Sequence, residues 1–215
     1  MTPHLASETT LTLCRMAPVI PVLVIRDPAH ARPLAAALVA GGLPVLEVTL
    51  RTPAALEVIA EMADVAGAVV GAGTVLSPAD IRAVMAAGAG FAVSPGSTDR
   101  LLAACEEQGL PLLPGAATAT EAMRLLDRGY STQKFFPAEI AGGTAALRAL
   151  SAPLPQITFC PTGGIGPANC ADYLALSNVA CVGGSWVAPA DLIDKGDWDA
   201  IEALARHAAG LPRAG

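Results

Sequence analysis

Short runs of aliphatic and β-branched residues recur along the chain at intervals of 20 to 26 residues. They begin near Val19, Val45, Ala68, Phe91, Pro111, Ser131, Gln156 and Val179. Between them lie alanine- and leucine-rich segments with helical periodicity, such as residues 33–39 and 78–87. Eight strands that alternate with eight helices at near-equal spacing are typical of a parallel α/β barrel. We therefore expect a (β/α)8 TIM barrel with an extra N-terminal helix.

Local signals mark where several of these helices begin and end. Ser77 precedes a proline, Thr118 is followed three residues later by a glutamate, and Gly166 precedes a proline, so each predicts a helix start. Gly88 and Gly109 predict helix ends. A chain of 215 residues without a linker or low-complexity segment suits one barrel. We expect residues 1–215 to form a single domain, with residues 1–17 as a leader helix.

The composition limits the partners of the chain. Acidic residues outnumber basic ones, 19 to 13, and the net charge is −6. This balance disfavours nucleic acid or an anionic membrane as a partner. The longest charge-free segment, residues 149–171, contains four prolines and three glycines, which a membrane-spanning helix does not tolerate. Because the N-terminus also lacks the pattern of a signal peptide, we expect a cytoplasmic protein.

Cysteine and histidine usage argues against a metal centre. The five cysteines form no Cys-x-x-Cys pair and lie in apolar stretches, where reduced thiols pack as small hydrophobic groups. His4, His30 and His207 are far apart in sequence, and none neighbours another potential ligand. We therefore expect neither a histidine-based metal site nor a catalytic triad.

Lys134 stands out because only two of the 13 basic residues are lysines. It lies between Gln133 and two phenylalanines, and no other charge occurs between Arg128 and Glu139. Such surroundings favour the neutral amine, which is the form that attacks a carbonyl carbon to make a Schiff base. The alternative is a strand lysine that reaches solvent or pairs with an acid.

Strand periodicity places further polar groups with Lys134. In residues 45–51 the even positions are aliphatic, so the odd positions direct Glu47 and Arg51 into the barrel. The same parity rule turns Thr74 and Thr162 inward. These groups would converge at the carboxyl ends of the strands, where barrel enzymes have their active sites. Glu47 and Arg51 could instead form a structural ion pair.

Glycine pairs follow the predicted seventh and eighth strands. Gly163 and Gly164 follow the seventh strand, and Gly183 and Gly184 end the eighth strand, directly before Ser185. Glycines there allow backbone N–H groups to approach an anion, and this position is a recurrent phosphate site in barrels. The pattern predicts a phosphate-binding site.

Six motifs together resemble the 2-keto-3-deoxy-6-phosphogluconate (KDPG/KHG) aldolases, from about Val19 to the end of the chain. They are residues 46–51 (LEVTLR), 71–74 (GAGT), 94–96 (SPG), 134–139 (KFFPAE), 159–165 (FCPTGGI) and 183–186 (GGSW). The resemblance implies a class I aldolase of the Entner–Doudoroff pathway that releases pyruvate and glyceraldehyde 3-phosphate. It also implies a homotrimer without a metal ion or other cofactor.

The resemblance assigns roles to eleven residues. Lys134 would form the Schiff base and Glu47 would be the general acid and base. Arg51, Thr74, Pro95 and Phe136 would bind the carboxylate and pyruvyl group, Thr162 a substrate hydroxyl, and Gly163, Gly164, Gly184 and Ser185 the phosphate.

Three alternatives remain. One is a related specificity, either for 4-hydroxy-2-oxoglutarate or for the galactonate epimer of the substrate. Another is a metal-dependent epimerase or decarboxylase, which the lack of a histidine cluster disfavours. The third is a non-catalytic phospho-sugar-binding barrel, which would explain the glycines but not Lys134 with Glu47.

Overall fold

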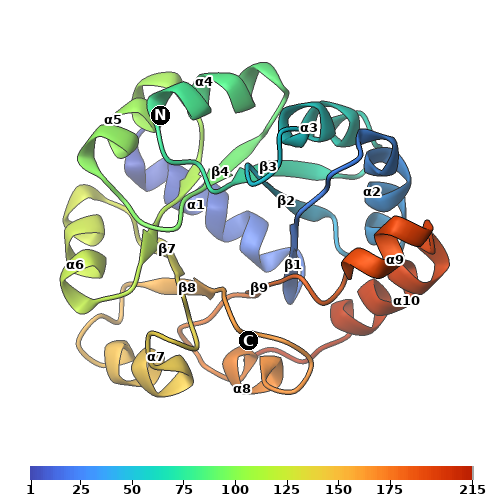
Figure 1. Ribbon diagram of the computed structural model, residues 1–215. Helices are drawn as coiled ribbons and strands as arrows, with labels where there is room; N and C mark the ends of the chain where they lie inside the picture. The colour runs from blue at the N-terminus through green and yellow to red at the C-terminus, as the bar shows by residue number, and fades with distance from the viewer. Residues whose placement is uncertain (215) are drawn as a thin grey trace.

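The computed structural model describes residues 1–214 and consists of parallel strands surrounded by helices (Figure 1). Strands and helices alternate after a first helix, as the sequence predicts. The strands are β1 (Val19–Leu23), β2 (Val45–Thr49), β3 (Val69–Gly73), β4 (Phe91–Val93), β5 (Leu112–Leu113), β6 (Gly115–Ala116), β7 (Thr132–Phe135), β8 (Thr158–Pro161) and β9 (Val182–Gly184). The helices are α1 (Pro3–Arg15), η1 (Pro28–His30), α2 (Ala31–Ala40), α3 (Ala55–Ala63), α4 (Pro78–Ala86), α5 (Asp99–Gln108), α6 (Ala119–Arg128), α7 (Gly143–Ser151), α8 (Cys170–Leu174), α9 (Ala190–Lys195) and α10 (Trp198–Ala209).

The strands form two curled parallel sheets rather than one continuous ladder. One sheet has the order β5-β4-β3-β2-β1-β9, and the other has the order β6-β7-β8. Between the strand regions of β8 and β9, only isolated bridges join Phe159 to Val179 and Thr162 to Gly183. The α/β class with parallel strands is confirmed, whereas a complete eight-stranded barrel is not.

The break on the other side falls at Pro114. The sequence predicted one fifth strand, but the structure has two short pieces, of which β5 pairs with β4 and β6 pairs with β7. Proline has no N–H to donate, so it interrupts a ladder. Its carbonyl still accepts a hydrogen bond of 2.8 Å from the Lys134 N–H. The chain therefore changes partners at the proline.

Most predicted helix boundaries agree with the structure. Ser77 and Thr118 both form capping boxes, and α5 ends at Gly109 in the left-handed conformation. The start predicted at Gly166 is wrong, because α8 begins at Cys170. Asn169 explains the delay, since its side chain accepts from the Gly166 N–H at 2.8 Å and stabilises a turn before the helix.

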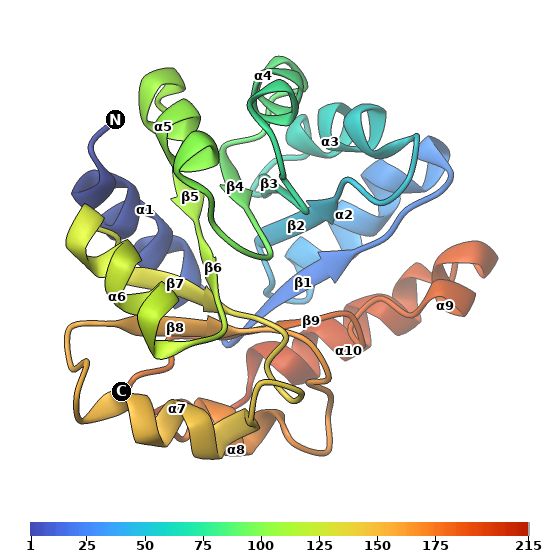
Figure 2. The ribbon, with the colours of Figure 1, turned by 60° about the vertical axis from the view of Figure 1, so that its left-hand side comes forward.

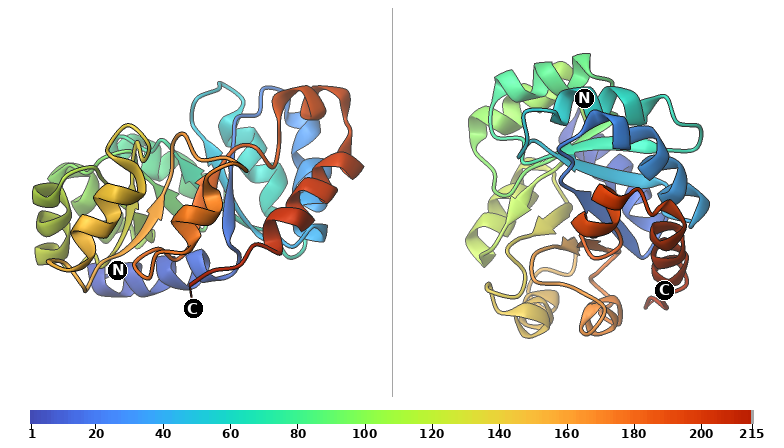
Figure 3. Two further views of the ribbon diagram at one scale, coloured as in Figure 1. Left: turned by 90° about the horizontal axis from the view of Figure 1, so that it is seen from below. Right: turned by 45° about the vertical axis from the view of Figure 1, so that its right-hand side comes forward.

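Helix α1 closes the amino-terminal end of the strands and lies against β5 and β7 (Figure 2). Ser7 attaches it there, because its hydroxyl accepts from the Ser131 N–H at 3.0 Å and its carbonyl accepts from the Thr132 hydroxyl at 3.0 Å. The chain end also reaches α1, where Arg213 donates to the Arg15 carbonyl (Figure 3, left). The carboxyl ends of the strands are therefore left for a site.

Two apolar cores lie on the two faces of the strands. The larger one fills the space between the strands and the outer helices. The smaller one lies in the space that the two curled sheets surround, called the ring below, and contains Cys14, Ile20, Val45, Phe91, Val93, Leu113, Cys160, Ala180 and Cys181. No helix within residues 1–214 combines the length and apolarity needed to cross a bilayer.

Candidate active site

A cavity of about 380 Å³ opens at the carboxyl ends of the strands. Its lining draws on both sheets and on the loops that follow β2, β3, β4, β7, β8 and β9. All eleven residues singled out from the sequence line it: Glu47, Arg51, Thr74, Pro95, Lys134, Phe136, Thr162, Gly163, Gly164, Gly184 and Ser185. Residues up to 138 positions apart in the chain thus share one space.

A buried ion pair lies in this cavity. The Nζ atom of Lys134, on β7, is 3.0 Å and 3.3 Å from the two carboxylate oxygens of Glu47, on β2. The two side chains are only 6% and 5% exposed. Within residues 1–214 no ion pair joins Glu47 to Arg51, so the alternative of a structural pair between them is wrong. Because each buried charge is paired with the other, neither bears an uncompensated desolvation cost.

The local sequence of β7 explains why Lys134 faces inward. On one side of the strand, Gln133 donates to the carbonyls of Ala122 and Tyr130, while Phe135 packs edge-on against a phenylalanine of β8. Side chains alternate across a strand, so Lys134 must point to the opposite side, into the ring. Its Nζ atom lies 5.6 Å from the centre of the Phe136 ring.

A glycine makes room for the carboxylate of Glu47. Gly73 is the partner of Thr49 in the β2–β3 ladder, and a Cβ atom on Gly73 would lie 2.3 Å from Glu47 Oε1. Any side chain at this position would displace the acid from Lys134. The hydroxyl of Thr49 is not free to bind a ligand, because it donates a hydrogen bond of 2.8 Å to the Leu23 carbonyl.

Polar groups at the rim surround this pair. Arg51 follows β2 and is exposed, so its guanidinium is accessible to an anionic ligand. Thr74 follows β3 and has φ of 61°, a left-handed conformation that β-branched residues rarely adopt. Such strain persists only where the surrounding structure holds it, and it is concentrated at functional sites.

The Thr162 hydroxyl faces the same cavity without a partner. Its oxygen is buried and forms no hydrogen bond within the described residues. Gly183 allows this position, since a Cβ there would lie 2.3 Å from the Thr162 oxygen. A buried hydroxyl without a partner costs free energy unless a ligand completes it. A rotation of the Thr162 side chain toward the cavity would let this hydroxyl donate to a ligand.

The glycine-rich segments after β8 and at the end of β9 line part of the cavity. Gly163 and Gly164 have φ of 104° and 77°, where other residues are strained. The N–H groups of Gly164 and Ser185 donate to no acceptor in residues 1–214. Free backbone donors of this kind bind anions. Gly184 has an additional structural role, because a Cβ there would lie 1.7 Å from the Trp186 ring.

Glu139, which the sequence motif contained without a role, ties the loop after β7 to the glycine loop after β8. Its carboxylate accepts a hydrogen bond from the Tyr173 hydroxyl, and its N–H donates to the Gly163 carbonyl at 3.1 Å. Burial raises the pKa of Tyr173, and the Glu139 carboxylate raises it further, so this hydroxyl stays a neutral donor.

Sequence reasoning missed the apolar part of the lining. Val22, Val24 and Ile165 complete the wall of the cavity. Their alternation along β1 is the signal that could have found Val22 and Val24, since they share the parity that points into the ring. An apolar wall suits the carbon skeleton of a small substrate.

The chain matches the family model described as KDPG and KHG aldolase over residues 11–204. It is 55% identical, over 192 residues and 89% of each chain, to the 2-dehydro-3-deoxy-phosphogluconate aldolase of Pseudoalteromonas atlantica.

Two solved structures resemble most of the chain. One is the Zymomonas mobilis 2-keto-3-deoxy-6-phosphogluconate aldolase with 3-phosphoglycerate, at 52% identity and a TM-score of 0.91 over 94% of this chain and 96% of that one. The other is the KDPG aldolase of Legionella pneumophila with pyruvate captured as a covalent carbinolamine intermediate. It is 46% identical, with a TM-score of 0.89 over 93% of this chain and 98% of that one.

Proposed function

The chain belongs to the KDPG and KHG aldolase family, and from this premise we propose that it cleaves 2-dehydro-3-deoxy-6-phosphogluconate through a Schiff base on Lys134. The products are pyruvate and glyceraldehyde 3-phosphate. The observation that carries the proposal is the buried pair of Lys134 and Glu47, 3.0 Å apart in the cavity. A non-catalytic sugar-binding barrel has no use for an amine and a carboxylate so placed.

Glu47 is positioned to move protons at the reacting nitrogen. Transfer of a proton from Lys134 to Glu47 gives the neutral amine, which attacks the 2-keto carbon and forms a carbinolamine. Glu47 then returns the proton to the departing hydroxyl, directly or through water, and an iminium forms. A covalent carbinolamine with pyruvate, seen in the Legionella relative, is the intermediate that this route requires.

The iminium accepts the electrons of the bond that breaks. A base removes the proton of the substrate's C4 hydroxyl, the bond between C3 and C4 breaks, and the aldehyde leaves. The electron pair remains as the enamine of pyruvate on Lys134. Protonation of that enamine and hydrolysis release pyruvate and regenerate the amine. Because the iminium is the electron sink, the proposed route needs no metal ion.

The remaining lining residues orient the substrate. Arg51 and the Thr74 region bind the carboxylate, while Pro95 and Phe136 contact the pyruvyl carbons. Thr162 donates to a hydroxyl of the aldehyde half, which gives its free oxygen a partner. Gly163, Gly164, Gly184 and Ser185 bind the phosphate, for which the unpaired N–H groups of Gly164 and Ser185 are the support.

We also propose that residues 1–215 are one domain whose two sheets complete a (β/α)8 ring through the bridges between β8 and β9. The resemblance to the family further suggests a homotrimer in the cytoplasm. Exposed apolar side chains such as Leu76 (60% exposed) supply surface for an interface. Light scattering coupled to size-exclusion chromatography measures the subunit number directly.

Borohydride trapping tests the Schiff base. Incubation with pyruvate and borohydride should inactivate the protein and add one reduced adduct to the peptide that carries Lys134. Lys195 is the matched control within the chain, since its side chain is exposed and pairs with Asp191 on the surface. Peptide mass spectrometry locates the adduct. A modification at Lys195 alone, or none at all, refutes the proposed chemistry.

Substrate comparison tests the specificity. We expect lactate dehydrogenase-coupled pyruvate release to be fastest with the phosphorylated gluconate derivative, since the phosphate provides binding energy that orients the reacting carbon. A faster reaction with 4-hydroxy-2-oxoglutarate or with the galactonate epimer would assign the related specificity instead. Activity that disappears with EDTA and returns with Mg²⁺ would contradict the metal-free route.

A further inference from the structure

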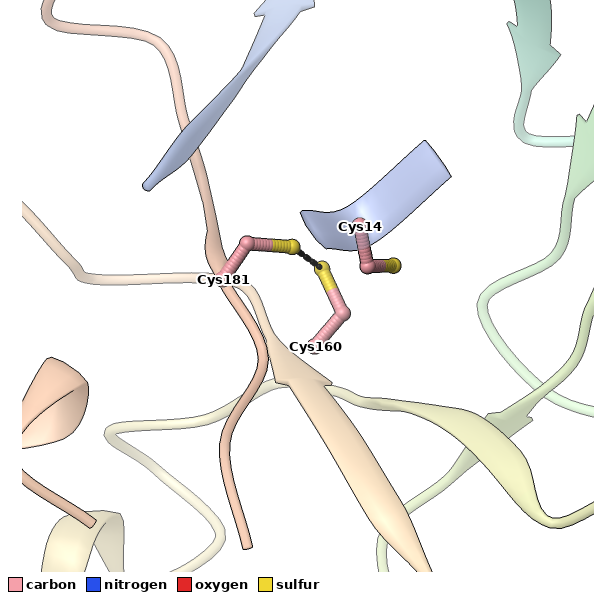
Figure 4. Close-up of side chains that lie close together, drawn as sticks. All are labelled: Cys14, Cys160 and Cys181. Atoms are coloured by element: carbon pink, nitrogen blue, oxygen red, sulfur yellow. Dashed lines mark hydrogen bonds between the residues drawn. The ribbon is translucent and has the colours of Figure 1, made fainter. Parts of the chain in front are cut away.

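Three cysteine side chains meet inside the ring, although they come from distant parts of the chain (Figure 4). Cys14 lies in the last turn of α1, Cys160 on β8, and Cys181 directly before β9. Their sulfur atoms all lie within 4.8 Å of one another, and those of Cys160 and Cys181 are 3.5 Å apart. None of the three lines the substrate cavity.

The separation of the sulfurs suits a shared metal ion. A metal–sulfur bond of ~2.3 Å places two sulfurs on one ion at roughly 4 Å from each other. The three thiols lie in this range already, so small side-chain rotations bring them to one centre. Three sulfurs around one ion, without a fourth, define a trigonal site.

The surroundings of the thiols decide which ion fits. Ile20, Phe91 and Leu113 belong to the same interior core and offer no polar ligand. No further cysteine, histidine or acid joins the group within residues 1–214. Zn²⁺ in structural sites takes four ligands, whereas soft thiolate sites also select Cu(I). A site of three sulfurs in a mainly apolar core, which the Thr162 hydroxyl borders at Cys160, therefore favours the softer ion.

We propose that Cys14, Cys160 and Cys181 form a trigonal binding site for one Cu(I) ion, separate from the aldolase centre. Each thiol that binds as a thiolate releases one proton to solvent. Lys134 is the ladder partner of Cys160 in the β7–β8 pair, so the site lies next to the buried pair of Lys134 and Glu47. The ion would thus be held beneath the polar cavity, between it and α1.

A second cavity lies next to the segments that carry the three cysteines. It measures about 400 Å³ and is lined by Arg15, Thr158, Ser177, Val179, Ala180, Arg213 and Ala214. Arg15 directly follows Cys14, Ala180 directly precedes Cys181, and Thr158 lies two residues before Cys160. This cavity therefore borders the chain segments on which all three cysteines lie.

Competition with a chromophoric Cu(I) chelator tests the proposal. The metal-free protein, kept anaerobic with a non-thiol reductant, should withdraw one equivalent of Cu(I) per chain. Binding should also raise the melting temperature, since an ion that binds only the native state stabilises it. X-ray absorption should show three sulfurs at ~2.3 Å from copper.

The other two cysteines provide matched controls. Cys14→Ala should weaken Cu(I) binding at least ~100-fold, and it suits a helix position, where alanine is well tolerated. Cys105→Ala and Cys170→Ala should leave the affinity unchanged, because neither thiol belongs to the cluster. Circular dichroism checks the fold of each variant, and Cys181→Ala is the second test should Cys14→Ala fail to fold.

Four outcomes would overturn the proposal. They are the absence of stoichiometric Cu(I) binding, equal binding by Cys14→Ala or Cys181→Ala, coordination by two sulfurs only, and tighter binding of Zn²⁺ than of Cu(I).

Discussion

The interior of the ring contains two regions that use the same strands differently. The polar region, at the carboxyl ends, holds Glu47, Lys134 and Thr162, and the apolar region, near α1, holds Val45, Phe91 and the three cysteines. On β2, Val45 and Glu47 lie two residues apart on the same face of the strand. Cys160 on β8 and Thr162, just after the end of β8, are related in the same way. A step of two residues along a strand therefore leads from the apolar region to the polar region.

The difference shows which part of the ring the fold depends on. Removing apolar side chains from a core leaves cavities and lowers stability. A buried ion pair contributes little stability compared with well-packed apolar residues, even though breaking it is costly. We therefore expect changes in the polar region to abolish activity and changes in the apolar region to reduce stability.

The largest effect is expected at Lys134. Lys134→Met removes the nucleophile and should lower turnover by ~10⁵-fold or more. It also leaves Glu47 unpaired, so the variant should be less stable than the wild type. The double variant Lys134→Met with Glu47→Leu should recover that stability without recovering activity. Urea denaturation and the coupled assay measure the two effects, and a double variant that stays unstable would mean that the fold needs the pair.

Glu47→Gln should give the second largest effect. The amide keeps the size of the side chain and a hydrogen bond to Lys134 but cannot move a proton, so turnover should fall by ~10²–10⁴-fold. The melting temperature should fall less than in Lys134→Met, because the amide keeps a hydrogen bond to Lys134. If the melting temperature falls while the folded fraction keeps its turnover, Glu47 is only a structural partner of Lys134.

Phe91→Ala tests the apolar region. The ring lies over Gly71, where an added Cβ would be 2.4 Å away, and it is 2% exposed. Its removal should cost about 3–5 kcal/mol of unfolding free energy, measured by urea denaturation at a temperature where the variant remains folded. Turnover per folded molecule should stay near the wild-type value. A loss of turnover as large as that of Glu47→Gln would show that the two regions are not separable.

Thr162→Val should give the smallest effect. It should leave stability unchanged or raise it, and it should lower kcat/KM. The hydroxyl has no partner in the free protein, so its loss should leave stability unchanged or raise it by up to about 1 kcal/mol. The ratio kcat/KM should fall ~10-fold, since a hydrogen bond to the substrate is lost. A loss of stability with unchanged kcat/KM would mean that Thr162 serves packing alone.

Local patterns predicted much of the fold and the position of the site. The spacing of the aliphatic runs gave the strand positions, and the parity of residues 45–51 placed Glu47 inside the ring. The same rule placed Lys134, because Gln133 and Phe135 are suited to the helix-facing side. Such patterns are readable because each strand repeats its preferences over only a few residues.

Other features depended on segments far apart in the chain. The predicted fifth strand is divided at Pro114 into β5, which pairs with β4, and β6, which pairs with β7. Which neighbour each piece pairs with depends on the strand that lies within its reach. The delayed start of α8 results from the Asn169 side chain, which competes with the helix for backbone groups. The division of the fifth strand could not be inferred from Pro114 alone, nor the late start of α8 from Gly166 alone.

The sequence by itself determined the alternation of strands and helices, the inward side of several strands and eleven of the residues around the substrate cavity. Only the tertiary structure decided that Lys134, rather than Arg51, is the partner of Glu47. It alone brought Cys14, Cys160 and Cys181 together. The physical reason is that side-chain direction is a property of a few neighbouring residues. Which distant atoms meet depends on strand register and on how α1 packs beneath the ring.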